Sequence, residues 1–423
     1  MAKGTILSDD FLRQLTAVGE VDILVGVPTS NNRKTIEHVV SAIQIGLVKY
    51  FPRARTVLIN PDAGSRDGTS ELLRNASLPD FRTALATPPL RTMHTVTTRY
   101  HPGLGPGGAL HLILAAADLL RARACAIVSP DLVSITPEWI DALIRPIYHE
   151  GYDYLAPIYQ RQKFDGLLIK NILSPLISAI YGYRIEEPVG GEFGFSGTLA
   201  CELLKQDLWH EDFIRYGAPV WMTATALAGN YRLCQSFLGP KIQSSNHAEV
   251  GLADTIQRVV GALFRSLEMH ESQWISRNGL QTVPTFGFQS ELDLGPLRVN
   301  RKKMFDMFRT GVAELSSILE KILSPATLDQ IREVAQSDEN RCYFSDELWV
   351  KTVYEFAIAY HHSVMNRDHL LQALTPIYRG RISSYLLENH GASFQELKAR
   401  IESLRIQYAN LKPDFITGWR GKA

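Results

Sequence analysis

The chain has 423 residues, more than one hydrophobic core usually holds, so we expect two domains of unequal size. Its 44 basic and 44 acidic residues cancel, and 45% of the residues are hydrophobic, which is ordinary for a globular protein. Without a basic surplus, we expect no binding to nucleic acid, and no net charge drives binding to anionic membranes, although peripheral membrane contact stays open. No apolar run reaches the roughly 18 residues of a membrane span, and residues 1–10 lack a secretion-signal pattern, so we expect a cytoplasmic location.

The first third of the chain alternates strand-like and helix-like segments. An apolar, β-branched run at 21–27 is typical of a strand buried on both faces of a parallel sheet. A turn, a helical pattern at 35–48 and a strand at 57–60 complete a βαβ unit. The alternation repeats with a strand at 96–98, a glycine-rich segment at 103–108, a helix at 109–123 and a strand at 125–129. This pattern predicts a doubly wound α/β domain, whose ligands bind beyond the carboxyl ends of the strands.

Helical periodicity dominates the chain after residue 300. The predicted helices are 303–323, 328–336, 346–362, 368–387 and 393–411. We therefore expect an α/β domain over 1–275, a linker over 276–299 and a helical C-terminal domain over 300–423 that serves homodimerisation or forms a lid. The most apolar stretch, 167–183, contains Pro175 and predicts an internal helix broken at that proline.

Four scattered cysteines lack the spacing of a metal site, so we interpret them as reduced side chains with a structural role. They are Cys125, Cys201, Cys234 and Cys342.

Polar loops follow two neighbouring strands, with the sequence GVPTSNN at 26–32 and NPDAGSRDGT at 60–69. Two loops at neighbouring strand ends can grip one nucleotide, and the candidate contacts are Pro28, Thr29, Asn31 and Asp62. A carboxylate such as Asp62 suits the N3–H of a uracil. The alternative is that both loops are plain turns stabilised by Asx hydrogen bonds.

The pairing of these loops resembles the opening of GT-A glycosyltransferases, and later segments narrow the resemblance to the retaining glucosylglycerate and mannosylglycerate synthase group. These segments are SPDL and ITPEW within 129–139, APIY and KFDG within 156–166, PVGGEFGFSG at 188–197, YG and WMT within 216–223, and FLGPKI at 237–242. The resemblance covers the chain from about Asp22 to His270. It implies a GT-A fold, which is a Rossmann-like nucleotide-diphospho-sugar transferase fold, for this part of the chain, and the smaller all-α domain predicted from helical periodicity follows it.

The resemblance also implies roles for two carboxylates. Asp131 stands where the family carries the last acid of its DxD motif, and it would hold the Mg²⁺ or Mn²⁺ ion that neutralises the departing diphosphate. Glu192, with Gly190 and Gly191, would lie beside the donor sugar and accept hydrogen bonds from its hydroxyls. A helix N-terminal acid is the alternative for Glu192.

Two further segments offer binding groups. Gly105 and Gly107 precede a helix, so their amides could hold a phosphate, although a tight turn explains them equally well. Arg161 and Lys163 could bind an anionic acceptor, although such charges more often decorate a solvated loop.

Three departures from the family pattern fall on the metal and acceptor chemistry. Ser129 replaces the first acid of the DxD motif, Pro219 lies where an aspartate is expected, and Gln243 stands where a histidine metal ligand is expected. His247 could replace that ligand only if its loop were shifted. Asp131 alone would make a poor site for a hard dication.

We therefore expect an enzyme that moves a hexose from UDP-hexose or GDP-hexose to a small acceptor, anionic acceptors included, with retention of configuration. Catalysis would rest on positioning the reactants and on stabilising the departing diphosphate. The alternative is a catalytically degraded paralogue that serves as a nucleotide-binding, regulatory or assembly scaffold. A third reading is a metal-free transferase in which cationic side chains replace the ion.

Overall fold

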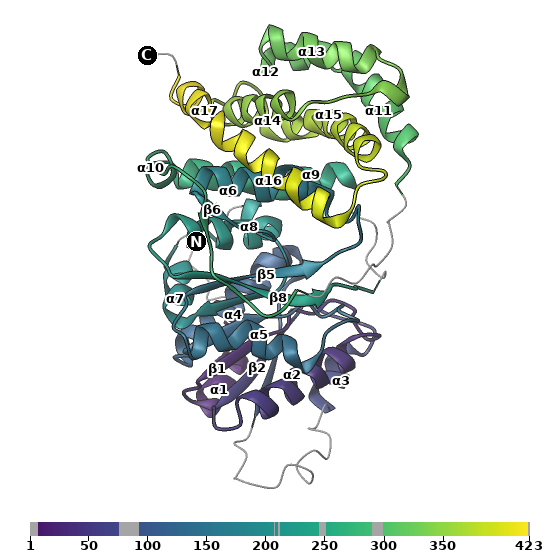
Figure 1. Ribbon diagram of the computed structural model, residues 1–423. Coiled ribbons are helices and arrows are strands. Elements are labelled where there is room, and N and C mark those ends of the chain that lie inside the picture. The colour runs from purple at the N-terminus through teal and green to yellow at the C-terminus, as the bar shows by residue number, and fades with distance from the viewer. Residues whose placement is uncertain are drawn as a thin grey trace. The chain divides into compact units, whose positions relative to one another are not determined.

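The computed structural model describes residues 7–75, 93–206, 208–209, 212–244, 251–289 and 299–421 (Figure 1). The chain forms two compact units, each assembled from separate stretches of sequence. The first comprises Met1–Gln160, Val189–His247 and Val283–Glu291, and the second comprises Arg161–Pro188, Ala248–Thr282 and Leu292–Ala423. This division differs from the expected one, because residues 161–188 and 248–282 group with the C-terminal helices.

An eight-stranded sheet forms the centre of the first unit, in the order β10-β8-β5-β7-β4-β1-β2-β3. Its strands are β1 (Ile23–Gly26), β2 (Thr56–Asp62), β3 (His94–Arg99), β4 (Ala124–Ile127), β5 (Tyr154–Gln160), β7 (Phe193–Ser196), β8 (Leu233–Pro240) and β10 (Thr285–Phe286). Strand β7 runs antiparallel to β4 and β5, and the remaining pairings among the described strands are parallel. The prediction of a mostly parallel α/β sheet is confirmed.

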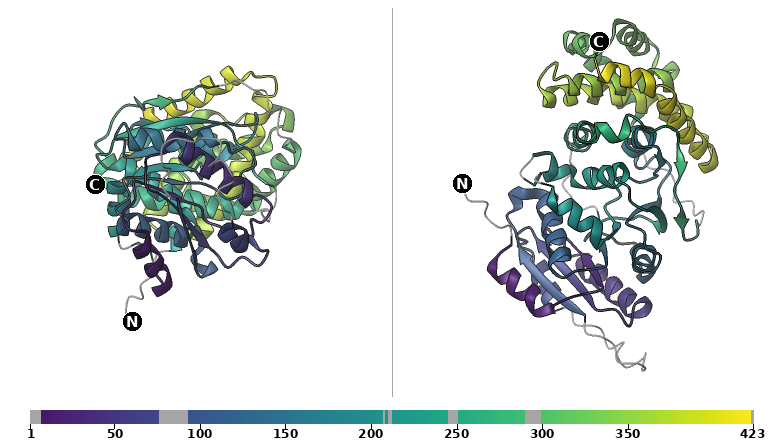
Figure 2. Two further views of the ribbon diagram at one scale, coloured as in Figure 1. Left: turned by 90° about the horizontal axis from the view of Figure 1, so that it is seen from below. Right: turned by 90° about the vertical axis from the view of Figure 1, so that its left-hand side faces the viewer.

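Helices cover both faces of this sheet (Figure 1). They are α1 (Asp9–Val18), α2 (Ile36–Tyr50), α3 (Thr69–Asn75), the 3₁₀ turn η2 (Pro102–Leu104), α4 (Gly105–Leu119), α5 (Pro137–Tyr148), α7 (Gly197–Lys205) and α8 (Asp212–Ala228). Side chains alternate across a strand, so Val25 of β1 joins α2 and α5 in one core while Gly26 faces Ile113 of α4 on the other side. Helix α1 lies along the edge strand β3 (Figure 2).

The second unit is mainly helical. It contains the π-helical segment η3 (Ile169–Leu173), α6 (Ser174–Tyr181), α9 (Leu252–Met269), α10 (Glu271–Trp274), α11 (Arg301–Glu314), α12 (Ser316–Ile322), α13 (Pro325–Gln336), the 3₁₀ turn η4 (Glu339–Arg341), α14 (Asp346–His361), α15 (Arg367–Glu388), α16 (Phe394–Asn410) and α17 (Lys412–Trp419). The two short strands β6 (Tyr183–Arg184) and β9 (Gln281–Thr282) pair in parallel. Helix α14 runs beside α15 (Figure 1).

Several predicted boundaries need correction. The break expected at Pro175 is absent, because the π-helical segment η3 passes directly into α6, and Leu173 and Ser174 both keep right-handed helical backbone angles. The segment expected as a linker contributes β9 and β10 to two sheets, so at least residues 281–286 are part of the fold. The helix expected at 109–123 begins at Gly105, so the predicted glycine loop forms its first turn.

Hydrogen bonds tie the C-terminal helices to the earlier segments of the second unit. The indole of Trp349 in α14 donates to the Asn171 carbonyl at 2.8 Å. In α16, Arg405 donates to the Ser174 hydroxyl and to Glu186, each at 2.8 Å. These partners are buried or half-buried, so α14 and α16 complete a core that residues 161–188 begin.

The described cysteines are all unpaired, with Cys125, Cys234 and Cys342 buried and Cys201 half-buried, which agrees with a packing role. No helix within the described ranges has both the length and the apolar character needed to cross a membrane.

Candidate functional site

The two predicted nucleotide loops lie side by side at the carboxyl edge of β1 and β2. The Thr29 amide donates to the Pro61 carbonyl, and the Ala63 amide donates to the Thr29 carbonyl, both at 2.9 Å. The parallel pairing of β1 and β2 places both strand ends at one edge, as the sequence predicted.

Asp62 is fully buried between these loops. Its carboxylate accepts hydrogen bonds from the Thr29 hydroxyl at 2.9 Å, the Ser65 hydroxyl at 2.5 Å and the Ser65 amide at 2.9 Å. The Asx bonding proposed as the alternative is therefore present. A contact between Asp62 and a nucleotide base remains a prediction.

The outer parts of the loops are also linked. Asn31 has a positive φ of 57°, its amide donates to the Ser65 hydroxyl at 2.8 Å, and its side-chain oxygen accepts from the Arg66 amide at 2.9 Å. Asn31 is exposed and Pro28 half-buried, whereas Thr29 is 2% exposed. Of these four predicted contacts, Pro28 and Asn31 therefore present the most surface to a ligand.

Close helix packing explains the predicted phosphate glycines. A Cβ on Gly105 would lie 2.6 Å from the Arg215 carbonyl oxygen, and one on Gly107 would clash with the Ile214 carbonyl oxygen of α8. Both glycines are buried. They allow α4 and α8 to approach, and phosphate binding by their amides remains a prediction.

The antiparallel strand β7 brings Glu192 to the same edge of the sheet. Phe193, the first residue of β7, pairs with Ile127, the last residue of β4. The start of β7 therefore lies where the parallel strands end, and Gly191, next to Glu192, lies near Ser129. Gly190 and Gly191 lead into this strand, and Gly191 has a φ of +92° that favours glycine.

The Glu192 carboxylate is completely buried and belongs to a charged cluster. One of its oxygens, Oε2, accepts from the Tyr159 hydroxyl and from the Lys241 ammonium, the latter at 2.8 Å. Lys241 also donates to the Gly190 carbonyl and lies 4.6 Å from the centre of the Tyr159 ring. The other oxygen, Oε1, is the only buried carboxylate oxygen without a hydrogen-bond partner among the described residues.

Asp131 follows the carboxyl end of β4, and its side chain is buried, with 5% relative exposure. Its carboxylate is paired with the side-chain amide of Gln243. The Gln243 side chain donates to its two oxygens at 3.2 and 3.1 Å. Gln243 also forms an antiparallel bridge with Leu132. Gln243, which stands where the resemblance leads us to expect a histidine metal ligand, therefore lies beside Asp131.

These residues do not fit a divalent cation. Hard dications take several oxygen ligands with compensating charge, whereas the Asp131 carboxylate is paired here with an amide donor and Ser129, two residues earlier, is neutral. No group of three His, Cys, Asp or Glu side chains suited to a metal occurs among the described residues. His247 lies outside the residues that the structure describes.

The two predicted acceptor residues belong to the second unit. Arg161 donates to Glu187 at 2.6 and 2.9 Å and to Asp165 at 3.1 Å. Burial opposes the charge of Arg161, but both carboxylates together raise the pKa of its guanidinium. Lys163 donates to the His390 carbonyl at 3.0 Å. Acceptor binding by Arg161 and Lys163 therefore remains a prediction.

The third departure, Pro219, lies inside α8, where its carbonyl accepts from the Thr223 hydroxyl at 3.0 Å. Trp221 and Met222 are fully buried, in agreement with a core role.

Sequence reasoning missed Lys241 and Tyr159 as members of the cluster. Tyr159 lies near the carboxyl end of the parallel strand β5, and Lys241 directly follows the parallel strand β8. A polar side chain at the carboxyl end of a parallel strand is a recognisable signal. Their contact with Glu192 depends on strand order, which that signal does not contain.

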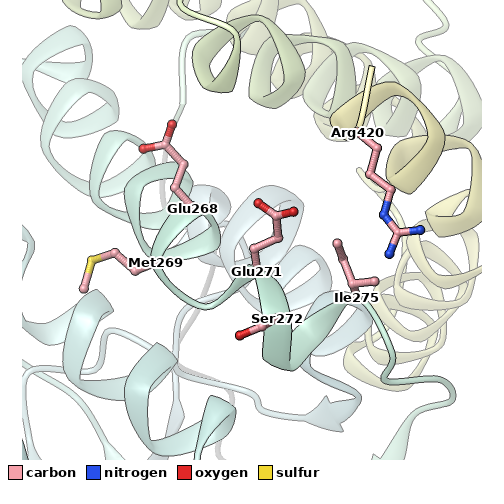
Figure 3. Close-up of a pocket in the computed structure, with 6 residues that line it drawn as sticks. All are labelled: Glu268, Met269, Glu271, Ser272, Ile275 and Arg420. Carbon is pink, nitrogen blue, oxygen red and sulfur yellow. The ribbon is translucent and has the colours of Figure 1, made fainter. Parts of the chain in front are cut away.

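Two hollows elsewhere contain none of the predicted site residues. One, of about 420 Å³, lies in the second unit, where Glu268 and Glu271 point to the same side of the α9–α10 segment (Figure 3). Its lining is Glu268, Met269, Glu271, Ser272, Ile275 and Arg420. The other, of about 600 Å³, adjoins Arg123 at the amino end of β4, opposite the candidate site.

Comparison with known proteins gives matches among solved structures alone. No protein-family model matches the chain, and no curated protein matches it. One match is glucosyl-3-phosphoglycerate synthase from Mycobacterium tuberculosis in complex with Mn²⁺, UDP and glucosyl-3-phosphoglycerate. It is 20% identical to this chain, with a TM-score of 0.40, and the match covers 60% of this chain and 83% of that one. The same enzyme with Mn²⁺, UDP-glucose and phosphoglyceric acid is 20% identical with a TM-score of 0.40, covering 61% and 84%. A mycobacterial protein is 21% identical with a TM-score of 0.41, covering 60% and 78%.

Proposed function

We propose that this protein binds a nucleoside-diphosphate hexose at the carboxyl edge of the sheet and transfers the hexose to a small acceptor with retention of configuration. The base would lie by the loops that carry Pro28 and Asn31, and the sugar would lie by Gly190, Gly191 and Glu192. Catalysis would consist of positioning the reactants and stabilising the departing diphosphate.

The unpartnered oxygen of Glu192 is the observation that carries this proposal. A buried carboxylate oxygen without a donor is unfavourable by about 1–3 kcal/mol, more for a charged group. A hexose presents several hydroxyl donors that would satisfy Glu192 Oε1. The position of Glu192 at the strand-end edge is where ligands of α/β sheets bind.

A transfer screen tests the proposal. Purified protein would be incubated with UDP-, GDP- and ADP-hexoses and a panel of small acceptors, in separate series with Mg²⁺, Mn²⁺ or EDTA. We expect donor consumption and a glycosylated product for at least one combination. The anomeric configuration of that product, measured by NMR, should match that of the donor.

Glu192→Gln should reduce turnover by about tenfold to a hundredfold, because an amide replaces a charged acceptor of a sugar hydroxyl. Lys49→Met is the control, because Lys49 forms an exposed pair with Glu138 in the same unit. Equal turnover by wild type and Glu192→Gln would show that the Glu192 carboxylate has no role in the transfer reaction.

A second function is supported by the pairing of Asp131 with Gln243. Because this pairing occupies the one retained acid, the domain could serve as a nucleotide-binding scaffold without turnover. Calorimetry would then show nucleotide binding while the transfer screen shows no product. Transfer in any reaction mixture would exclude the scaffold.

A further inference from the structure

Lys241 is the buried cation of the cluster around Glu192. Its side chain is 5% exposed, and its ammonium donates to Glu192 and to the Gly190 carbonyl. An ammonium has three donors, so one remains without a partner among the described residues.

The backbone of Gly191 lies beside this ammonium. A Cβ on Gly191 would lie 3.4 Å from Lys241 Nζ and 3.0 Å from the Ser129 hydroxyl oxygen. Gly191 carries no such atom, so no side chain of this residue comes between the ammonium and the hydroxyl. Ser129 and Gly191 are half-exposed, so a ligand can reach them from solvent.

The chain after β8 is anchored in this position by backbone contacts. The Val133 amide donates to the Ile242 carbonyl at 2.9 Å, and the Ser244 amide donates to the Asp131 carbonyl at 2.9 Å. The Lys241 amide donates to the Gln160 carbonyl at 3.2 Å. Lys241 is therefore held against the ends of β4 and β5 rather than placed on a free loop.

We propose that the Lys241 ammonium and the Ser129 hydroxyl bind a phosphate oxygen of the nucleoside diphosphate, so that the protein binds this ligand without a divalent cation. This inference rests on the proposed function, because it locates the diphosphate of the donor. Ser129 and Lys241 then act in one direction. A serine in place of an acid removes a charge that would repel phosphate, and the lysine adds one that attracts it.

The rival account is that Lys241 only neutralises Glu192. Truncating the lysine alone would leave a buried unpaired carboxylate and endanger folding. The informative comparison is therefore between Glu192→Gln and the double variant Glu192→Gln with Lys241→Met. Both lack the Glu192 charge, and they differ in the lysine alone.

Calorimetry in EDTA would use inorganic pyrophosphate, UDP and uridine as probes. We expect wild type and Glu192→Gln to bind pyrophosphate and UDP, and the double variant to bind both about tenfold to a hundredfold more weakly. Uridine affinity should be equal in the two variants, since uridine carries no phosphate. Lys49→Met should behave as wild type, and thermal unfolding should show that the two Glu192 variants remain folded.

Three results would overturn the assignment of Lys241: equal affinities for pyrophosphate and UDP in the two Glu192 variants, no binding of either probe to wild type, or binding that EDTA abolishes and Mg²⁺ restores. Failure of the proposed function looks different. In that case lysine-dependent pyrophosphate binding persists in EDTA while the transfer screen yields no product from any nucleotide sugar.

Discussion

At the residue scale, the buried hydrogen bonds of Asp62 predict that its carboxylate stabilises the two loops. Asp62→Ala should lower the free energy of unfolding by about 2–4 kcal/mol, because the donors of Thr29 and Ser65 lose a buried acceptor. The same change should weaken nucleotide binding by about 1–3 kcal/mol if the carboxylate also contacts the base. Urea denaturation and calorimetry measure the two effects separately.

Asp306→Ala is a suitable control for the unfolding measurement, because Asp306 is exposed and its loss should change stability by less than about 0.5 kcal/mol. An Asp62→Ala protein of unchanged stability would show that the hydrogen bonds of Asp62 do not hold the two loops together. Absence of binding for UDP, GDP and ADP at millimolar concentration would contradict the nucleotide site as a whole.

Metal affinity can be tested by introducing at two positions the residues that the family resemblance leads us to expect. The contact between Gln243 and Asp131 places position 243 within ligand range of that carboxylate. Ser129→Asp together with Gln243→His should therefore raise Mn²⁺-dependent nucleotide binding, and each change alone should do less because both ligands act on one ion. Manganese titrations followed by electron paramagnetic resonance, with and without UDP, measure this. Tight Mn²⁺ binding and turnover by the unchanged protein would show that another ligand completes the site.

At the element scale, the glycines that begin α4 allow two helices to pack closely. Gly107→Ala should destabilise the protein by about 1–3 kcal/mol, because the added methyl meets the Ile214 carbonyl of α8, which belongs to the backbone. The gain in helix propensity of about 1 kcal/mol offsets only part of this. Urea denaturation of the variant measures the net change.

Gly391→Ala is the matched control, because no atom lies within 4 Å of the position of its Cβ. If Gly107→Ala lost nucleotide affinity at unchanged stability, the glycine would serve the ligand rather than the helix contact.

At the scale of the whole molecule, the C-terminal helices complete a core that earlier segments begin. A chain ending at Pro296 lacks the helices that carry Trp349 and Arg405, the partners of Asn171 and Ser174. We expect lower solubility or a changed mass in light scattering, because the apolar faces of α6 and α9 lose their cover. The same measurement on the full chain tests the expected homodimer. A truncated chain that stays monodisperse, equally stable and of unchanged oligomeric state would make these helices an independent domain.

Local pattern predicted many elements of this protein. The apolar run at 21–27 contains β1, and the periodicities after residue 300 correspond to α11–α16, with 303–323 divided into two helices. The adjacency of the Thr29 and Asp62 loops also followed from the sequence, because neighbouring parallel strands end at one edge. Helix α17 was not predicted.

The sequence by itself determined periodicity, and through it the α/β class, the helical C-terminal region and the motifs at strand ends, because these patterns depend on residues close together in the chain. Tertiary structure alone decided which strand runs antiparallel and which side chains meet. Lys241 reaches Glu192 across 49 residues of sequence, and Gln243 reaches Asp131 across 112. Such pairs depend on strand order and direction, which local hydrophobic spacing does not specify. The pairing of Lys241 with the buried Glu192 is for that reason visible only in the folded chain.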